Sequence, residues 1–158
     1  MIVVRQAAAD DVDRLLMLAD EMDRFYGGTN TEPIEHRRQQ VRDALFGNPP
    51  AARVSLALDG QTAVGFASYS FLWPAVGLTR SLYLKELYVS QSQQRRGVGR
   101  ALMESLLEIA RKYDCSRVEW TTDADNSAAQ VFYETFGVEP SSSKLFYRLE
   151  QLPWAAGG

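Results

Sequence analysis

The turn between a strand-like segment and a strongly periodic helix carries the residues of this chain that are best suited to bind an anion. It reads Gln94-Arg95-Arg96-Gly97-Val98-Gly99-Arg100 and follows an apolar segment at 82–89. A glycine-containing turn at a helix start directs several backbone N–H groups to one point, and the helix dipole and the arginine side chains add positive charge there. The pattern predicts a phosphate or diphosphate site; the alternative is an arginine turn that is merely solvated.

One familiar phosphate-loop pattern fits this turn, and two do not. No Gly-Lys pair is present for a P-loop, and Leu102 stands where the dinucleotide-binding fingerprint needs its last glycine or alanine. The hexapeptide from Gln94 to Gly99 matches Gln/Arg-x-x-Gly-x-Gly/Ala. It resembles the acetyl-CoA diphosphate loop of the GNAT superfamily of N-acetyltransferases, and the resemblance extends through Asn126 and Tyr133 to Gly137.

The resemblance implies acetyl-CoA as co-substrate and no metal. In that family, backbone groups at the end of the strand before the loop pair with the pantetheine arm, and a helix further along the chain lies beside the cofactor. The cofactor-binding residues implied here are Leu87, Tyr88, Val89, Gln94, Arg95, Arg96, Gly97, Val98, Gly99, Arg100, Asn126, Ala129 and Tyr133. From Tyr83 onward the layout looks most like the diamine and polyamine acetyltransferases.

Two side chains could move the protons that acetyl transfer to an amine requires. By analogy with the family, Tyr133 donates its phenolic proton to the departing sulfur; the alternative is a half-buried tyrosine whose hydroxyl only finds a partner. Glu86 alternates with Leu84 and Tyr88 on one face of an apolar strand, where a carboxylate is costly to bury unless it is paired or functional. We expect Glu86 to deprotonate the amine, directly or through water; the alternative is a structural ion pair.

The acceptor is predicted to be a small cationic amine. The region 21–35 is acidic, and aromatic side chains from this region and from 70–80 could add surface that attracts a cation. A solvated acidic helix face is the plain alternative. Two other functions stay open: a non-catalytic acyl-CoA-binding sensor, which could have lost Tyr133 and Glu86, and acetylation of a protein N-terminus or lysine, which would need an open peptide groove.

Composition limits the number of domains, the location and the partners that we expect. A chain of 158 residues with 46% apolar residues suits one domain, predicted at 1–150 with a tail at 151–158. Neither a long apolar run nor a signal-peptide layout is visible, and Cys115 is the only cysteine, so a cytoplasmic location is the default. A net charge of −3 predicts no nucleic-acid partner, and no membrane partner is expected. His36, the only histidine, lies in a charged segment and is a poor metal ligand candidate.

Apolar periodicity predicts one mixed sheet with helices, an α/β or α+β fold. Strands are expected at 2–6, 53–58, 62–72, 82–89, 117–122 and 145–149, and helices at 11–26, 33–46, 98–113 and 126–136. Segments 82–89 and 117–122 read as buried strands, and Asp59-Gly60 as a tight hairpin turn. The order matches the GNAT fold, which implies a splayed strand pair that holds acetyl-CoA. The apolar C-terminal segment 145–154 further suggests a homodimer.

Overall fold

A computed structural model describes residues 1–29 and 31–152 of the chain. They form two compact units that divide after Thr121, and each is described by itself. The predicted single domain at 1–150 stays a prediction, and most of the predicted tail lies outside the described residues. No helix in the described part of the chain is long and apolar enough to cross a membrane.

The first unit is built on a five-stranded sheet in the order β1-β2-β3-β4-β5. Its strands are β1 (Ile2–Gln6), β2 (Arg53–Asp59), β3 (Thr62–Leu72), β4 (Arg80–Val89) and β5 (Cys115–Trp120). Neighbours are antiparallel except β4 and β5, which are parallel and are joined through the helix α3 (Val98–Lys112). The predicted mixed α/β fold is confirmed.

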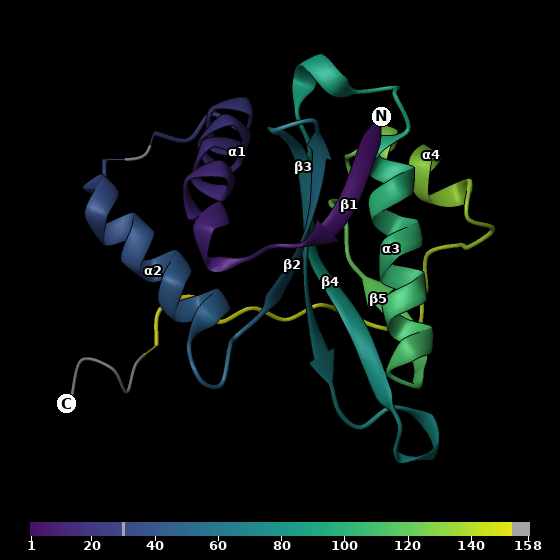
Figure 1. Cartoon of the computed structure of the whole chain (residues 1–158). Coiled ribbons are helices and arrows are strands. Elements are labelled where there is room, and N and C mark those ends of the chain that lie inside the picture. The colour runs from purple at the N-terminus through teal and green to yellow at the C-terminus, as the bar shows by residue number, and fades with distance from the viewer. Residues whose placement is uncertain (30, 153–158) are drawn as a thin grey trace. The chain divides into compact units, whose positions relative to one another are not determined.

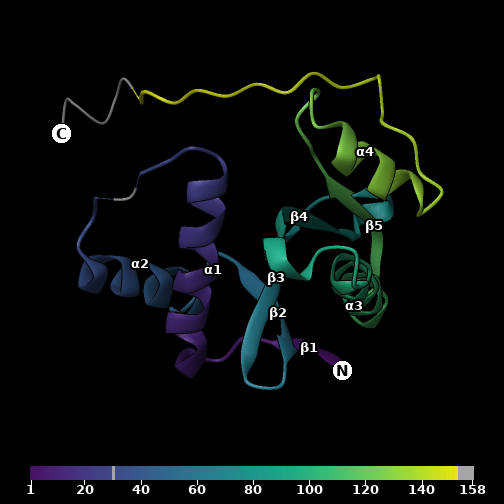
Figure 2. The same cartoon turned by 90° about the horizontal axis from the view of Figure 1, so that it is seen from above.

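Helices cover both faces of this sheet. Figure 1 and Figure 2 show α1 (Val12–Phe25) and α2 (Ile34–Phe46) on one side and α3 on the other. On the α3 side, Val98, Leu102 and Leu106 are buried at the spacing of one helix face. On the α1 side, Leu15 and Leu18 pack against apolar side chains of β2, β3 and β4. The two faces therefore bury separate layers of the core.

The hairpin between β2 and β3 forms where the sequence predicts it. Asp59 pairs with Thr62, and Gly60 between them has a φ of 61°, which glycine adopts without steric cost. Strand β5, by contrast, lies at the edge of the sheet, and Arg117 and Glu119 are exposed. The prediction that this strand is buried is therefore wrong, because its apolar residues indicate only that one face of the strand is covered.

A buried carboxylate fastens the start of α1 to β1. Asp11 occupies the N-cap position of α1, but its side chain makes no cap hydrogen bond to that helix. Its Oδ2 and Oδ1 accept from Arg5 at 2.7 and 3.0 Å, Oδ2 accepts the Ala8 N–H at 2.7 Å, and Oδ1 accepts from Arg14 at 3.0 Å. Asp11 is fully buried, and these donors, Arg5 above all, hold its carboxyl pKa well below its usual range.

We expect Asp11→Asn to lower the free energy of unfolding by about 3 kcal/mol at pH 7, because it leaves the arginines beside a neutral group. A carboxylate with a lowered pKa contributes stability that is present above about pH 4 and is lost as the pH falls. The difference between wild type and variant should therefore narrow below about pH 4, as measured by urea unfolding. Asp43→Asn, at an exposed position of α2, is the control; an equal loss there would contradict this role.

The second unit contains the short helix α4 (Ser127–Glu134). Asn126 caps this helix: its side chain accepts the Ala129 N–H at 3.1 Å. Gly137, with a φ of 76°, follows the helix end, where glycine is common. The predicted strand at 145–149 is wrong, because residues 138–152 contain neither helix nor strand. An alternating apolar pattern favours a strand but does not provide the neighbouring strand with which it must pair.

Candidate active site

The end of β4 has one open edge. β4 pairs with β5 only from Arg80 to Leu84, opposite Cys115 to Trp120. From Gly65 to Ser68, strand β3 continues to pair with the other edge of β4 as far as Val89. Strand β5 ends at Trp120, the residue that pairs with Leu84, so within the first unit residues 85–89 of β4 are paired on one side only. The splayed strand pair that the resemblance implies stays a prediction.

Alternation along the ladder assigns the backbone groups of this edge. The Ser90 N–H donates to the Val64 carbonyl at 2.9 Å. Because the groups of successive residues turn to opposite edges, Tyr88 is directed to β3, whereas Leu87 and Val89 are directed to the open edge. Of the predicted trio, Leu87 and Val89 are thus placed to pair with an added extended chain, and Tyr88 contributes its side chain to the core.

A bulge in β4 decides which face Glu86 occupies. Glu86 pairs with Ser68, but Leu84 pairs with Tyr69, so Lys85 is an extra residue in the strand. The bulge puts Glu86 on the same face as Tyr88, toward α1 and α2, and Leu84 on the α3 face. The expectation that Glu86 shares a face with Leu84 is corrected for this reason. Glu86 itself is half-buried.

The Tyr88 side chain is the most unusual polar group near this edge. Its hydroxyl is buried and makes no hydrogen bond among the residues that the structure describes. Burial, and next the negative Glu21 carboxylate nearby, raise the pKa of Tyr88 to about 12. Tyr88 therefore stays protonated at neutral pH, and its side chain carries no charge.

Glu21 is a residue whose role the sequence did not reveal. Its carboxylate oxygens accept from the Ser90 hydroxyl at 3.0 and 3.1 Å, and Oε1 also accepts the Gln91 N–H at 3.0 Å. Glu21 was grouped with the acidic acceptor region, but it instead ties α1 to the segment that leaves β4. The residues in contact are about 70 positions apart, so no local pattern could indicate the pair.

The predicted diphosphate loop joins β4 to α3 with the geometry that an anion requires. Gly97 has a φ of 79° and precedes the first helical residue, Val98. The first backbone bond inside the helix is donated by the Ala101 N–H to the Gly97 carbonyl at 3.0 Å. The N–H groups of Val98, Gly99 and Arg100 precede it and have no partner within the helix. The chain therefore presents the donors that would face a diphosphate.

The loop side chains are positioned around this helix start. Arg95 has a positive φ of 66°, and its side chain is exposed. Arg96 lies 3.5 Å from Asp59 and also binds Gln93, and Arg100 lies 3.6 Å from Glu104. Arg96 and Arg100 are about half-exposed. Arg96 thus already contacts groups of the protein itself. Arg96 and Arg100 are nevertheless exposed enough to contact an anion from solvent.

Gly65 lets the start of α3 approach the sheet. A Cβ at this position would lie 2.9 Å from the Tyr88 carbonyl oxygen, 3.1 Å from Val98 Cγ1 and 3.3 Å from Leu102 Cδ1. A glycine inside a strand pattern often marks such a close approach, which is the sequence signal that could have identified it. Gly65 therefore positions the loop, although it is remote from the loop in sequence.

Gly65→Ala is expected to destabilise the protein by about 1–3 kcal/mol, because backbone and helix must move to admit the methyl group. It should also weaken acetyl-CoA binding, since the displaced residues begin the loop helix. Urea unfolding and calorimetric titration with acetyl-CoA measure the two effects. Thr62→Ala, at the exposed start of the same strand, is the control. Wild-type values for Gly65→Ala would show that the loop does not depend on this contact.

The remaining site residues lie in the second unit, on one short helix. Asn126 and Ala129 bond to each other at the start of α4. The Ala129 N–H is therefore used inside the helix cap. Tyr133 is half-buried in the last turn, with its ring centroid 5.3 Å from that of Phe132. These residues share one helix face, as predicted from their spacing.

Two carboxylates of the acidic region contact basic side chains of α2. Asp20 binds Arg37, and the Glu32 carboxylate lies 2.8 Å from His36 Nδ1. The hairpin 73–79 joins the start of β4, the opposite end from the open edge, so its aromatic residues do not adjoin that edge. No group of three or more side chains that could hold a metal ion occurs among the described residues.

Known proteins are similar to this chain in both sequence and fold. A profile of the Acetyltransferase (GNAT) family matches residues 15–138. The chain is 32% identical over 96 residues to the D-amino-acid N-acetyltransferase of Saccharomyces cerevisiae, covering 60% of this chain and 58% of that enzyme. It is 22% identical over 144 residues to the thialysine N-epsilon-acetyltransferase of Sus scrofa, covering 86% of this chain and 83% of that enzyme.

A solved structure of an integron cassette protein from V. cholerae superposes with a TM-score of 0.84 at 27% identity, covering 98% of this chain and 96% of that one. The chain thus spans a little over half of the yeast relative and nearly the whole of this structural neighbour. Because the family profile covers most of the chain, including the diphosphate loop and α4, the chain belongs to the acetyltransferase (GNAT) family.

Proposed function

We propose that this protein is an acetyl-CoA-dependent N-acetyltransferase that acetylates a primary amine of a small molecule by direct attack in a ternary complex. The observation that carries the proposal is the open edge of β4, which leads into a helix start preceded by a left-handed glycine. This combination provides an extended-chain partner and an anion site in succession. An acyl-pantetheine diphosphate has those same parts in the same order.

The residues fit acetyl-CoA in the following way. The backbone groups of Leu87 and Val89 pair with the amides of the pantetheine arm, and residues 94–100 surround the diphosphate. Asn126 and Tyr133, on α4 of the second unit, are the further residues that the resemblance assigns to the cofactor. A backbone N–H at the open edge polarises the thioester carbonyl, on which negative charge develops during the reaction.

Acetyl-CoA supplies the acetyl group as a thioester: the amine nitrogen forms a bond to the carbonyl carbon, and the carbon–sulfur bond breaks. Glu86 accepts the proton that the amine must lose, directly or through a water molecule. Tyr133 donates its phenolic proton to the sulfur as it leaves. Glu86 then releases its proton to solvent and the Tyr133 phenolate takes one up, so protons and charges balance over one turnover.

Relatives support a small amine as acceptor. The two relatives above are named for acetylation of D-amino acids and of the ε-amine of thialysine. Both are primary amines on small molecules, which agrees with the diamine-like or other cationic amine predicted from the sequence. The cytoplasmic location and the homodimer stay predictions.

The function is tested by thiol release from acetyl-CoA with a panel of amines, with product mass as the second readout. The panel contains lysine, D-amino acids, alkyl amines, diamines and an aminoglycoside. Turnover with one of these amines supports the proposal. Acetyl-CoA binding without release on any amine would favour a sensor, and acetylation of a peptide alone would favour a protein acetyltransferase.

Glu86→Gln tests the base. We expect kcat/KM to fall about 100-fold at neutral pH and the pH–rate profile to shift, because the titrating carboxylate is gone. Stopped assays from pH 5 to pH 9 measure this. Glu108→Gln, on the exposed side of α3, is the control. An unshifted profile would leave Glu86 with a structural role.

A further inference from the structure

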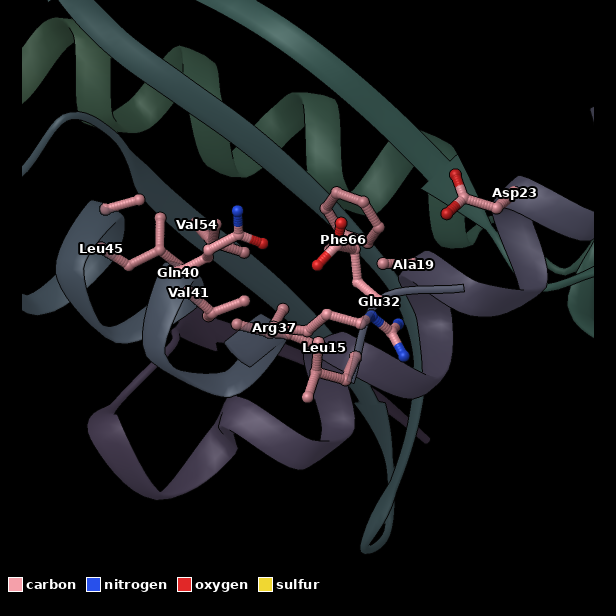
Figure 3. Close-up of a pocket in the computed structure, with 12 residues that line it drawn as sticks. Leu15, Ala19, Asp23, Glu32, Arg37, Gln40, Val41, Leu45, Val54 and Phe66 are labelled. Atoms are coloured by element: carbon pink, nitrogen blue, oxygen red, sulfur yellow. The ribbon is translucent and has the colours of Figure 1, made fainter. Parts of the chain in front are cut away.

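A pocket of about 340 Å³ lies between α1, α2 and the sheet, in the first unit. Figure 3 shows its walls: Leu15 and Ala19 from α1, Val41 and Leu45 from α2, and Val54 and Phe66 from the sheet. This volume is at the lower end of the range in which proteins bind small molecules. Apolar side chains form most of its surface, so it suits an apolar group of a few carbon atoms.

The charges at this pocket favour a cation at its rim. Arg37 lines the pocket, but its guanidinium binds Asp20, so the pair is neutral overall. Asp23 and Glu32 also line it. The Asp23 carboxylate makes no hydrogen bond or ion pair with any other described residue, and it lies one helical turn beyond Ala19 on the same face of α1. An ammonium group is its simplest partner.

The sheet register connects this pocket to the predicted base. Val54 pairs with Ser68, and Ser68 pairs with Glu86, so these residues form one row across β2, β3 and β4. In the next row, Phe66 pairs with Tyr88, and their ring centroids lie 6.3 Å apart. Because neighbouring strands are about 4.8 Å apart, the pocket wall at Phe66 lies about one strand from the residues beside the open edge.

We propose that this pocket holds the apolar body of the acceptor and that Asp23 attracts its ammonium group. The acceptor is then a monoamine with an aliphatic or aromatic body, and diamines and polyamines are poor substrates. This inference rests on the proposed function and narrows its substrate class. A second ammonium at the far end of the acceptor would have to enter the apolar walls, and burying an unpaired charge there is unfavourable.

Hexylamine and 1,6-diaminohexane test the selectivity, because they differ only in a methyl and an ammonium group at the far end. We expect kcat/KM for hexylamine to exceed that for 1,6-diaminohexane at least about tenfold. Asp23→Asn should raise the KM of hexylamine about tenfold with little change in kcat, since it removes binding and not chemistry. Equal kcat/KM values for the two amines would overturn the inference.

Filling the pocket is the second test. Ala44 lines it from α2, so Ala44→Leu should raise the KM of hexylamine about tenfold but leave that of methylamine unchanged. Gln39→Leu adds the same side chain at an exposed position of α2 and is the matched control. If Ala44→Leu only raises the melting temperature and leaves hexylamine kinetics unchanged, the pocket is a packing defect and the inference fails.

Direct binding separates this inference from the proposed function. Calorimetric titration of hexylamine into wild type and Ala44→Leu requires no turnover. Binding that Ala44→Leu weakens supports the pocket even if no acetyl transfer occurs. Turnover of other amines without any effect of Ala44→Leu or Asp23→Asn supports the acetyltransferase and rejects the pocket.

Discussion

Gly99→Asp should abolish acetyl-CoA binding and leave the protein folded. Gly99 is the second residue of α3, at the helix start that would face the diphosphate. A carboxylate there repels the diphosphate, and like charges brought together cost several kcal/mol, so affinity should fall at least about 1,000-fold. The same carboxylate interacts favourably with the helix dipole, so α3 should lose no stability.

Calorimetric titration with acetyl-CoA and with CoA measures the affinity, and thermal unfolding by circular dichroism measures the stability. Gly99→Ala is the matched control, because the loop pattern accepts alanine at this position and no charge is added. It should bind with near wild-type affinity. Wild-type affinity for Gly99→Asp would place the diphosphate elsewhere and remove the central support of the proposed function.

Elements that form because of local sequence signals were predictable. The turn at Asp59-Gly60 and the strand 62–72 appear as expected, because turn chemistry and apolar alternation are local signals. The turn before α3 was predictable for the same reason: its glycine, its arginines and the helix that follows are adjacent in sequence. The bend at Gly97 needs a positive φ, which glycine supplies at little cost.

Features that depend on distant partners were not predictable. The bulge at Lys85 moves Glu86 to the α1 face, and only the register with β3 reveals it. Glu21 looked like a member of an acidic segment and Asp11 like a residue at a helix start, yet each binds donors from other elements. The segment 145–149 is the opposite case: its local pattern favours a strand, but residues 138–152 contain none. Pairing across long sequence distances, rather than local propensity, decides these cases.

Tyr133→Phe should lower kcat by about 10²- to 10⁴-fold, the usual contribution of a general acid. The variant loses one hydroxyl and keeps the ring, which packs beside Phe132 in α4. Cofactor affinity should therefore change by less than about twofold. Tyr147→Phe, a matched change in the same unit, should leave both kcat and affinity unchanged.

The separate effects of Tyr133→Phe on kcat and on cofactor affinity distinguish the two roles that Tyr133 could have. A tyrosine that only positions the cofactor would weaken binding when its hydroxyl is lost, and kcat at saturation would change little. A tyrosine that protonates the sulfur would leave binding intact when its hydroxyl is lost, and the variant would slow the chemical step. Single-turnover quench measurements separate that step from product release. Wild-type single-turnover rates for Tyr133→Phe would assign the proton to solvent.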